Sequence, residues 1–352
     1  MRHNKQFKAL GIMSGTSLDG VDLALCSFIK ADNGWVFTIE KCETIAYSPA
    51  WLAKLDGAHQ LSGKDLILLH NEYGNYLGEL SKTFLKQEVV DCVASHGHTL
   101  FHQPNQQMTF QLGNGANIAA VSKQNVVCDF RTTDVALGGN GAPLVPIGDK
   151  YLFPAYKACI NLGGFANVSF LQNNKRVAFD ICPANMLLNT FAKKLGKNYD
   201  HDGILAASGE IDTVVLAQLN ALPYYQQHGA KSLGKEWFDE QIWPVCKNLD
   251  PTNGLRTAVE HIAMQIAQSL KDISGTVLCT GGGAHNSFLM QQVAVHSPNI
   301  TIPNTSPNII DFKEALIFAF LGVLNLTHET NVIGNATGSN KDHIAGAFYH
   351  SV

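Results

Sequence analysis

The feature that most constrains this sequence is a strand, glycine turn and strand pattern that occurs twice. An apolar run at 10–13 leads through a Gly/Ser/Asp cluster into a second apolar run at 21–28. A similar pattern returns at 158–171, where two glycines separate two apolar runs. Apolar runs on either side of such a tip are typical of β-hairpins. The two copies indicate an internal duplication.

The rest of the chain alternates predicted strands with predicted helices, which indicates an α/β fold. Further strands are expected at 89–95, 125–130 and 276–279, and helices at 64–87, 186–195, 211–219, 254–270 and 284–293. A chain of 352 residues, 45% hydrophobic, is long enough for two lobes with a cleft. We predict a first lobe at 1–133, joined by 335–352, and a second at 134–334.

Composition argues against several classes of protein. With 25 basic and 29 acidic residues the net charge is −4, and no run of five like charges offers a surface for nucleic acid. The first 16 residues lack the apolar core of a signal peptide, and the apolar stretch 315–326 is too short to span a bilayer. We therefore expect a cytoplasmic protein without a membrane partner. Its eight cysteines form no C-x-x-C pair, as expected of reduced core thiols.

The tip of the first hairpin combines backbone amides, two hydroxyls and two carboxylates. Glycines let a backbone approach phosphate oxygens, and Asp19 or Asp22 could hold Mg²⁺ directly or through water. An ordinary polar hairpin tip is an equally good interpretation of this turn alone. The residues assigned here to cofactor binding are Gly15, Thr16, Ser17, Leu18, Asp19, Gly20, Val21 and Asp22.

A triple glycine, Gly281, Gly282 and Gly283, follows an apolar strand and precedes the helix expected at 284–293. Its amides could face a nucleotide, although a close strand-to-helix crossing would also need glycines. The stretch 229–236 has P-loop spacing, but it ends in Glu where a Ser or Thr should bind Mg²⁺, and no apolar strand precedes it. We reject it as a phosphate loop.

His96 and His98 follow a predicted strand, and an H-x-H pattern in that place can bind zinc in barrel hydrolases. The sequence offers no matching ligands at later strand ends, so we favour a loop that hydrogen-bonds substrate or packs beside it.

Arg131 also ends a strand, and the planar set of N–H donors on its guanidinium suits an anionic group of a substrate. A hinge with a salt bridge is the simpler alternative for Arg131.

Two carboxylates are candidates for catalysis. Asp180 ends a strand, and the carboxyl ends of strands face the crevice in open α/β sheets. A helix cap or a turn is the commoner role for such an aspartate, and a general base is the more specific interpretation. Glu314 opens an apolar helix, where it could simply complement the helix dipole.

The order of these motifs closely resembles the anhydro-N-acetylmuramic acid kinase family, within the actin and sugar-kinase superfamily. The similar stretches are 11–22 (GIMSGTSLDGVD), 95–99 (SHGHT), 111–113 (QLG), 129–131 (DFR), 141–146 (GAPLVP), 161–168 (NLGGFANV), 179–180 (FD), 234–238 (GKEWF), 281–286 (GGGAHN) and 314–315 (EA). The resemblance runs nearly from end to end.

The resemblance implies a two-lobed, actin-like (ribonuclease H-like) ATPase fold with a central cleft between the lobes. It also implies an ATP- and Mg²⁺-dependent kinase that opens the 1,6-anhydro ring of anhydro-N-acetylmuramic acid and phosphorylates O6 during peptidoglycan recycling. Homodimer formation is implied in the same way. The site residues that follow are Asp180 as base with Glu314 assisting, Gly163, Gly164, Gly281, Gly282, Gly283 and Asn286 at the nucleotide, and His96, Asn117, Arg131 and Asp134 at the sugar and its lactyl carboxylate.

The sequence departs from the family pattern beside the base. Where the family usually has FDTGPGN, this chain has Phe-Asp-Ile-Cys-Pro-Ala-Asn at 179–185. Side chains therefore replace two glycines that allow close backbone approach. A kinase for another amino sugar, a sugar-sensing ATPase without transfer activity and a zinc-dependent amidohydrolase remain as alternatives.

Overall fold

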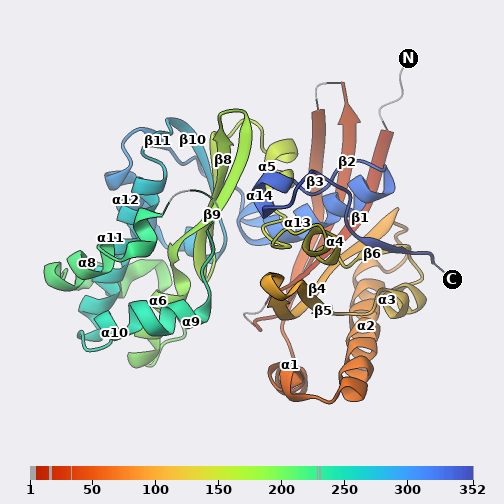
Figure 1. Ribbon diagram of the computed structural model, residues 1–352, viewed down its shortest axis with the longest axis horizontal. Helices are drawn as coiled ribbons and strands as arrows, with labels where there is room; N and C mark the ends of the chain where they lie inside the picture. The colour runs from red at the N-terminus through yellow and green to blue at the C-terminus, as the bar shows by residue number, and fades with distance from the viewer. Residues whose placement is uncertain (1–4, 16–17, 33, 228, 230, 352) are drawn as a thin grey trace. The chain divides into compact units, whose positions relative to one another are not determined.

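The computed structural model describes residues 5–15, 18–32, 34–227, 229 and 231–351, and the chain forms two compact units (Figure 1). The first unit comprises Met1–Phe153 and Phe312–Val352, and the second comprises Pro154–Asp311. These limits differ from the expected boundaries at 133 and 335, because 134–153 and 312–334 belong to the first unit. The physical reason is packing, because Gly148 lies against Ile317. The helices that contain these two residues, 146–152 and 307–326, are therefore in contact.

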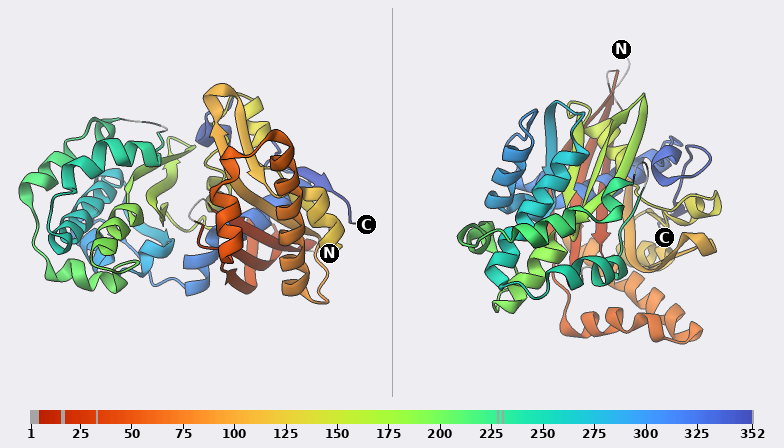
Figure 2. Two further views of the ribbon diagram at one scale, coloured as in Figure 1. Left: turned by 90° about the horizontal axis from the view of Figure 1, so that it is seen from below. Right: turned by 60° about the vertical axis from the view of Figure 1, so that its left-hand side comes forward.

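The first unit contains a mixed sheet whose strand order is β12-β6-β4-β1-β2-β3, with β5 paired to β4. β1, β2 and β3 are antiparallel, whereas β1, β4 and β6 are parallel. The C-terminal strand β12 returns to this sheet beside β6 (Figure 2). Its strands are β1 (Lys5–Ser14), β2 (Val21–Ala31), β3 (Gly34–Ile45), β4 (Cys92–Gln103), β5 (Met108–Leu112), β6 (Val126–Cys128) and β12 (Ala347–Tyr349). Its helices are α1 (Pro49–Asp56), α2 (Gly63–Leu85), α3 (Gly115–Ser122), α4 (Thr132–Ala136), α5 (Pro146–Leu152) and α14 (Gly334–Thr337), with most of α13 (Pro307–Leu326).

Alternation along β1 explains how this sheet is covered. Leu10 and Ile12 are fully buried in a cluster with Tyr73 and other side chains of α2. Gly11 points to the other side, where a Cβ atom would lie 1.8 Å from the carbonyl oxygen of Ala315. Successive side chains of a strand point to opposite faces of the sheet. The glycine therefore lets α13 approach one face while α2 covers the other.

The second unit repeats the same plan. Its sheet has the order β11-β10-β7-β8-β9, with β7, β8 and β9 antiparallel and β7, β10 and β11 parallel. The repeated order agrees with the duplication inferred from the two hairpins, and the predicted α/β fold is confirmed. The strands are β7 (Ala158–Leu162), β8 (Phe165–Gln172), β9 (Lys175–Pro183), β10 (Gly275–Thr280) and β11 (Ile300–Thr301). The helices are α6 (Asn185–Lys194), α7 (Ile204–Ser208), α8 (Thr213–Asn220), α9 (Lys235–Trp237), α10 (Trp243–Cys246), α11 (Pro251–Ser269) and α12 (Ser287–His296), with the 3₁₀ turns η4 (Pro223–Gln226) and η6 (Gly282–His285).

Helix α11 lies at the centre of the second unit, among α6, α8 and α12 (Figure 1). At Gly254 a Cβ atom would lie 2.3 Å from the ring of Phe191, so the glycine permits the close crossing of α11 and α6. The departures beside Asp180 belong to this core, where Ile181, Cys182 and Ala184 are all buried.

Two further expectations concern the described part of the chain. Within it, no helix combines the length and the apolar character needed to cross a membrane. Every cysteine except Cys42 is buried, as predicted for core thiols.

Candidate active site

In the first unit, the end of β1 lies beside the histidine pair. Ser14 of β1 is in register with His98 of the parallel strand β4. His96 and His98 lie within β4 and not in the loop expected from the sequence. Thr16 and Ser17, two of the predicted phosphate-binding residues, lie outside the described residues.

Arg131 and His96 form the most specific contact of this region. The guanidinium donates from Nε and Nη2 to Nε2 of His96, at 3.0 and 2.8 Å. Its Nη1 donates to the carbonyl oxygen of Gly141 at 2.6 Å. Burial, with Arg131 nearby, lowers the pKa of His96 to about 3, so the imidazole is neutral at physiological pH. Arg131 keeps its charge, because burial lowers its pKa only to about 10.

This geometry argues against the zinc-hydrolase alternative. Nε2 of His96 already accepts hydrogen bonds from a guanidinium, and Nδ1 lies 2.7 Å from the carbonyl oxygen of Gly97, to which it donates. A metal ion needs a ring nitrogen with an available lone pair, and a cation at Nε2 would meet the positive charge of Arg131. His96 is therefore unsuited to ligate zinc.

Glu314 at α13 shares an electrostatic environment with the hairpin. Burial raises the pKa of Glu314, the charges of Lys313 and Arg131 lower it, and those of Asp22 and Asp19 raise it again. Asp22 also accepts a hydrogen bond from Oγ1 of Thr44 at 2.6 Å. The fold thus gathers Asp19 and Asp22 of the first hairpin, Arg131 and Glu314 from three parts of the first unit.

The carboxylates of the hairpin suit a magnesium ion that arrives with a nucleotide. Mg²⁺ prefers oxygen ligands and is commonly held by one or two carboxylates, with waters and phosphates completing its shell. Asp19 offers such oxygens just before β2, and Asp22 offers them at the start of β2. Among the described residues no group of three or more His, Cys, Asp or Glu side chains is arranged to hold a metal. The oxygen donors of Asp19 and Asp22 fit Mg²⁺, and its binding here stays a prediction.

Two residues predicted to grip the sugar have other partners. Nδ2 of Asn117 donates to Oδ1 of Asn75, which links α3 to α2. Asp134 is completely buried, and Oδ2 accepts from the backbone N–H of Gly141 while Oδ1 accepts from Oγ1 of Thr337, both at 2.7 Å. These carboxylate oxygens already accept from the protein's own groups, which gives Asp134 a structural role, and its assignment to substrate binding stays a prediction. Asn117 likewise acts between two helices.

In the second unit, the second hairpin and the triple glycine lie together. A Cβ atom at Gly281, whose φ is +83°, would lie 2.5 Å from Oδ1 of Asn161 on β7. At Gly283 it would lie 2.8 Å from Cβ of Leu162. Only glycine fits this approach without strain. The fold therefore joins two motifs that the sequence separates by more than a hundred residues.

The backbone carbonyl groups of the second hairpin accept hydrogen bonds from the N–H groups at the start of α6. The carbonyl oxygen of Gly163 accepts from the N–H of Asn185, and that of Gly164 accepts from Ala184 and Met186. Asn286 also has a helix-capping role, since its Oδ1 accepts from the N–H of Leu289 at the start of α12. This hydrogen bond uses the side-chain oxygen of Asn286, and the assignment of Asn286 to nucleotide binding stays a prediction.

Asp180 lies on β9 next to a bulge in the pairing with β8, where Asp180 opposes Asn167 and Cys182 opposes Ala166. Bulges are common beside active sites, where they re-aim a side chain. Oδ2 of Asp180 accepts from the N–H of Leu233 at 2.9 Å. Oδ1 has no hydrogen-bond donor among the residues that the structure describes. Burial raises the pKa of Asp180 to about 6, although the Leu233 hydrogen bond lowers it.

The sequence interpretation missed the residues that surround Asp180. Oη of Tyr224 donates to the carbonyl oxygen of Asp180 at 2.7 Å, and the N–H of Asp180 donates to the carbonyl oxygen of Lys231 at 3.0 Å. They belong to the region rejected as a phosphate loop and to the turn before it. No local pattern identifies them, because their contact with Asp180 depends on tertiary packing.

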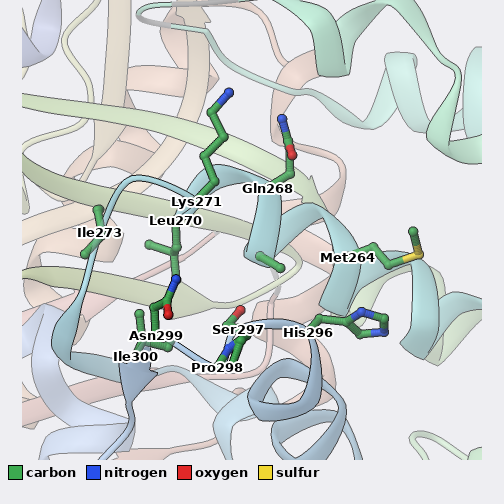
Figure 3. A pocket seen from close by; sticks show the side chains of 11 residues that line it. Met264, Gln268, Leu270, Lys271, Ile273, His296, Ser297, Pro298, Asn299 and Ile300 are labelled. Carbon is green, nitrogen blue, oxygen red and sulfur yellow. The ribbon is translucent and has the colours of Figure 1, made fainter.

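A cavity of about 380 Å³ lies elsewhere in the second unit, at the C-terminal ends of α11 and α12 beside β11 (Figure 3). Its lining includes Met264, Leu270, Lys271, His296 and Ser297. It contains none of the predicted site residues, so we do not connect it with the groups described above.

Comparison with known proteins gives a consistent result. The family model described as anhydro-N-acetylmuramic acid kinase matches residues 7–351. The anhydro-N-acetylmuramic acid kinase of Pseudomonas fluorescens is 33% identical over 368 residues, covering 97% of this chain and 98% of the relative. That of Francisella tularensis subsp. novicida is 33% identical over 370 residues, covering 96% and 97%. A solved structure, component A of the (R)-2-hydroxyglutaryl-CoA dehydratase of Acidaminococcus fermentans, has 15% identity and a TM-score of 0.41, covering 89% of this chain and 96% of that chain. By the extent of the family match and the identity to these relatives, the chain belongs to the anhydro-N-acetylmuramic acid kinase family.

Proposed function

We propose that this protein uses ATP to convert 1,6-anhydro-N-acetylmuramic acid into N-acetylmuramic acid 6-phosphate, a step of peptidoglycan recycling. The observation that carries the proposal, within a chain that matches the family from end to end, is the environment of Asp180. Its carboxylate has one oxygen held by Leu233 and a pKa near 6, which suits a general base at neutral pH.

In the proposed reaction, Asp180 takes a proton from a water molecule as the water oxygen bonds to the anomeric carbon. The bond between that carbon and O6 breaks, and O6 attacks the γ-phosphorus of ATP, with ADP as the leaving group. Opening of the strained bridge passes through an oxocarbenium-like state that a nearby carboxylate stabilises. Phosphoryl transfer needs mainly alignment and neutralisation of charge.

We assign the remaining roles as follows. Glu314 is the second candidate catalytic residue, and Arg131, held in place by its hydrogen bonds to His96, binds an anionic group of the sugar, for which the lactyl carboxylate is the candidate. The two hairpins and the triple glycine bind ATP, and Asp19 and Asp22 would hold the Mg²⁺ that neutralises its phosphates. A homodimer is part of the proposal, and a sedimentation mass near twice 38.2 kDa would support it.

The departures beside Asp180 do not favour another amino sugar. Ile181, Cys182 and Ala184 are buried in the core of the second unit, so their side chains are part of its packing. This supports the same substrate as in the rest of the family.

The test is mass spectrometry of the product formed from 1,6-anhydro-N-acetylmuramic acid and Mg-ATP in ¹⁸O-labelled water, with prompt quenching. We expect a 6-phosphate with one label at the anomeric oxygen. A phosphorylated sugar without label would refute the attack by water. No phosphorylated sugar would refute the substrate, and other amino sugars would then be profiled.

A further inference from the structure

The contacts of Asp180 come almost entirely from one short stretch of chain. Its N–H donates to the carbonyl of Lys231, its carbonyl accepts from Tyr224, and its Oδ2 accepts from Leu233. β9 is the edge strand of its sheet in the described structure, so these groups face away from β8. The backbone and one carboxylate oxygen of Asp180 are thus held by residues 44 to 53 positions further along the chain.

Lys231 holds this stretch together. Its Nζ donates to the carbonyl oxygens of Tyr224 and Gln227, both at 3.1 Å. The ammonium also lies 4.4 Å from the ring centroid of Tyr224 and 5.6 Å from that of Phe179, the residue before Asp180. One cation therefore ties the turn η4 to the segment that carries Leu233. Hydrogen bonds from a charged donor are stronger than neutral ones, and cation–π contacts add to them.

The turn η4 is itself anchored in the core. Tyr224 is 7% exposed and packs against Trp237, with ring centroids 5.1 Å apart. Oη of the neighbouring Tyr225 is 3.0 Å from Nε2 of His261, a fully buried residue of α11. Packing on α11 therefore fixes the turn η4. Lys231 links that turn to the segment that carries Leu233 through its hydrogen bonds.

We propose that Lys231 is a positioning residue for the catalytic step. Lys231 holds the segment that carries Leu233 against Asp180, so that Leu233 donates to Oδ2 and Oδ1 is left to accept the proton of the attacking water. This inference rests on the proposed function, because it takes Asp180 as the general base. Without the Lys231 contacts, Leu233 loses its fixed place and the carboxylate loses both its orientation and one donor. Misplacement of a reacting group lowers the rate of the chemical step, and loss of a donor to a carboxylate raises its pKa.

Other titratable groups lie near Asp180 and could contribute to the pH profile of kcat. They are Cys182 on β9, Tyr224 on η4 and Lys231. Burial raises the pKa of both the Cys182 thiol and the Tyr224 hydroxyl, so neither ionises near pH 6. The pKa of Glu314 is also raised, but the charges that act on it are those of Lys313, Arg131, Asp22 and Asp19. A shift of the acid limb that is caused by replacing Lys231 is therefore assigned to Asp180.

The experiment compares Lys231→Met with Lys231→Arg and with Lys235→Met, a matched control on an exposed lysine of α9 whose nearest acidic partner is Asp239. For Lys231→Met we expect kcat to fall about tenfold, KM for sugar and ATP to stay within about twofold, and the acid midpoint of kcat to rise by about 0.5 or more. Lys231→Arg should recover part of kcat and of the midpoint, and Lys235→Met should match the wild type.

Two results separate this inference from the proposed function. If Asp180→Asn is inactive while Lys231→Met keeps the wild-type kcat and pH profile, the positioning role is refuted and the base assignment stands. If Asp180→Asn stays active, the base assignment fails, and the inference fails with it. Should Lys231→Met not fold, Lys231→Gln removes the charge while keeping a polar side chain, and a wild-type kcat and acid midpoint in that variant would overturn the inference.

Discussion

At the scale of the residue, Asp180 meets two opposing requirements. It must ionise to accept a proton, yet burial favours the neutral acid and raises its pKa to about 6. We therefore expect kcat to rise with pH through about 6 and to level off above it. A pH profile of kcat at saturating substrates measures this, and a midpoint near the usual carboxyl value of 3.8 would contradict it.

Asp180 should also lower the free energy of unfolding at the pH values at which it is ionised and can act as a base. A carboxyl whose pKa is raised in the folded state contributes stability below its unfolded pKa, and that contribution is lost as the pH rises through the folded pKa. Above about pH 6, Asp180→Asn should therefore be more stable than the wild type, by on the order of 1 kcal/mol. Denaturant unfolding at pH 8 and pH 4 tests this, since the gain should disappear at pH 4.

A third prediction at this scale concerns Arg131. Its Nε and Nη2 both point to one nitrogen of His96 while Nη1 reaches Gly141, a geometry that an ammonium group cannot reproduce. Arg131→Lys should weaken sugar binding by about tenfold or more, as expected for the loss of about 1.4 kcal/mol or more. Calorimetric titration with the sugar measures the effect. Arg256→Lys, in the ion pair with Glu260, is the matched control and should bind the sugar normally.

At the scale of the element, one buried carboxylate joins segments from opposite ends of the chain. Asp134 of α4 accepts from Gly141 and from Thr337 of α14, which lies 203 residues away. Asp134 thereby fixes the glycine segment whose Gly141 carbonyl receives Arg131. Sequence analysis gave Asp134 no structural role, because no local pattern shows that its buried oxygens meet these distant donors.

Asp134→Ala should consequently destabilise the protein. It leaves the N–H of Gly141 and the hydroxyl of Thr337 buried without their acceptor, which costs about 2–4 kcal/mol when both are counted. Denaturant unfolding measures the loss, and Thr337→Val, which removes a single donor, should lose less. Equal stability of Asp134→Ala and the wild type would contradict the structural role.

At the scale of the whole molecule, the two units repeat one strand order, as the resemblance to actin-like kinases implied. Both units present glycine turns after their first strand, and the proposed function assigns both turns to ATP. Ligands that bind only the folded protein stabilise it by mass action.

Mg-ATP should therefore raise the melting temperature, and removal of Mg²⁺ should abolish turnover. At a ligand concentration of about 100 times Kd the expected stabilisation is about 2.7 kcal/mol. Differential scanning fluorimetry with ATP, with and without EDTA, measures the first effect, and a coupled ADP assay measures the second. Turnover that persists in EDTA would refute the role given to Asp19 and Asp22.

Sequence by itself determined the local part of this protein: the two hairpins, the alternation of strands and helices, and Asp180 on a strand. These features follow from the spacing of apolar residues and from turn chemistry, which involve neighbours in the chain. Only the tertiary structure decided that His96 accepts from Arg131, that Asp134 is buried, and that Tyr224, Lys231 and Leu233 surround Asp180. Those partners are tens to hundreds of residues apart, and it is packing of the core, not any local pattern, that brings their polar groups together.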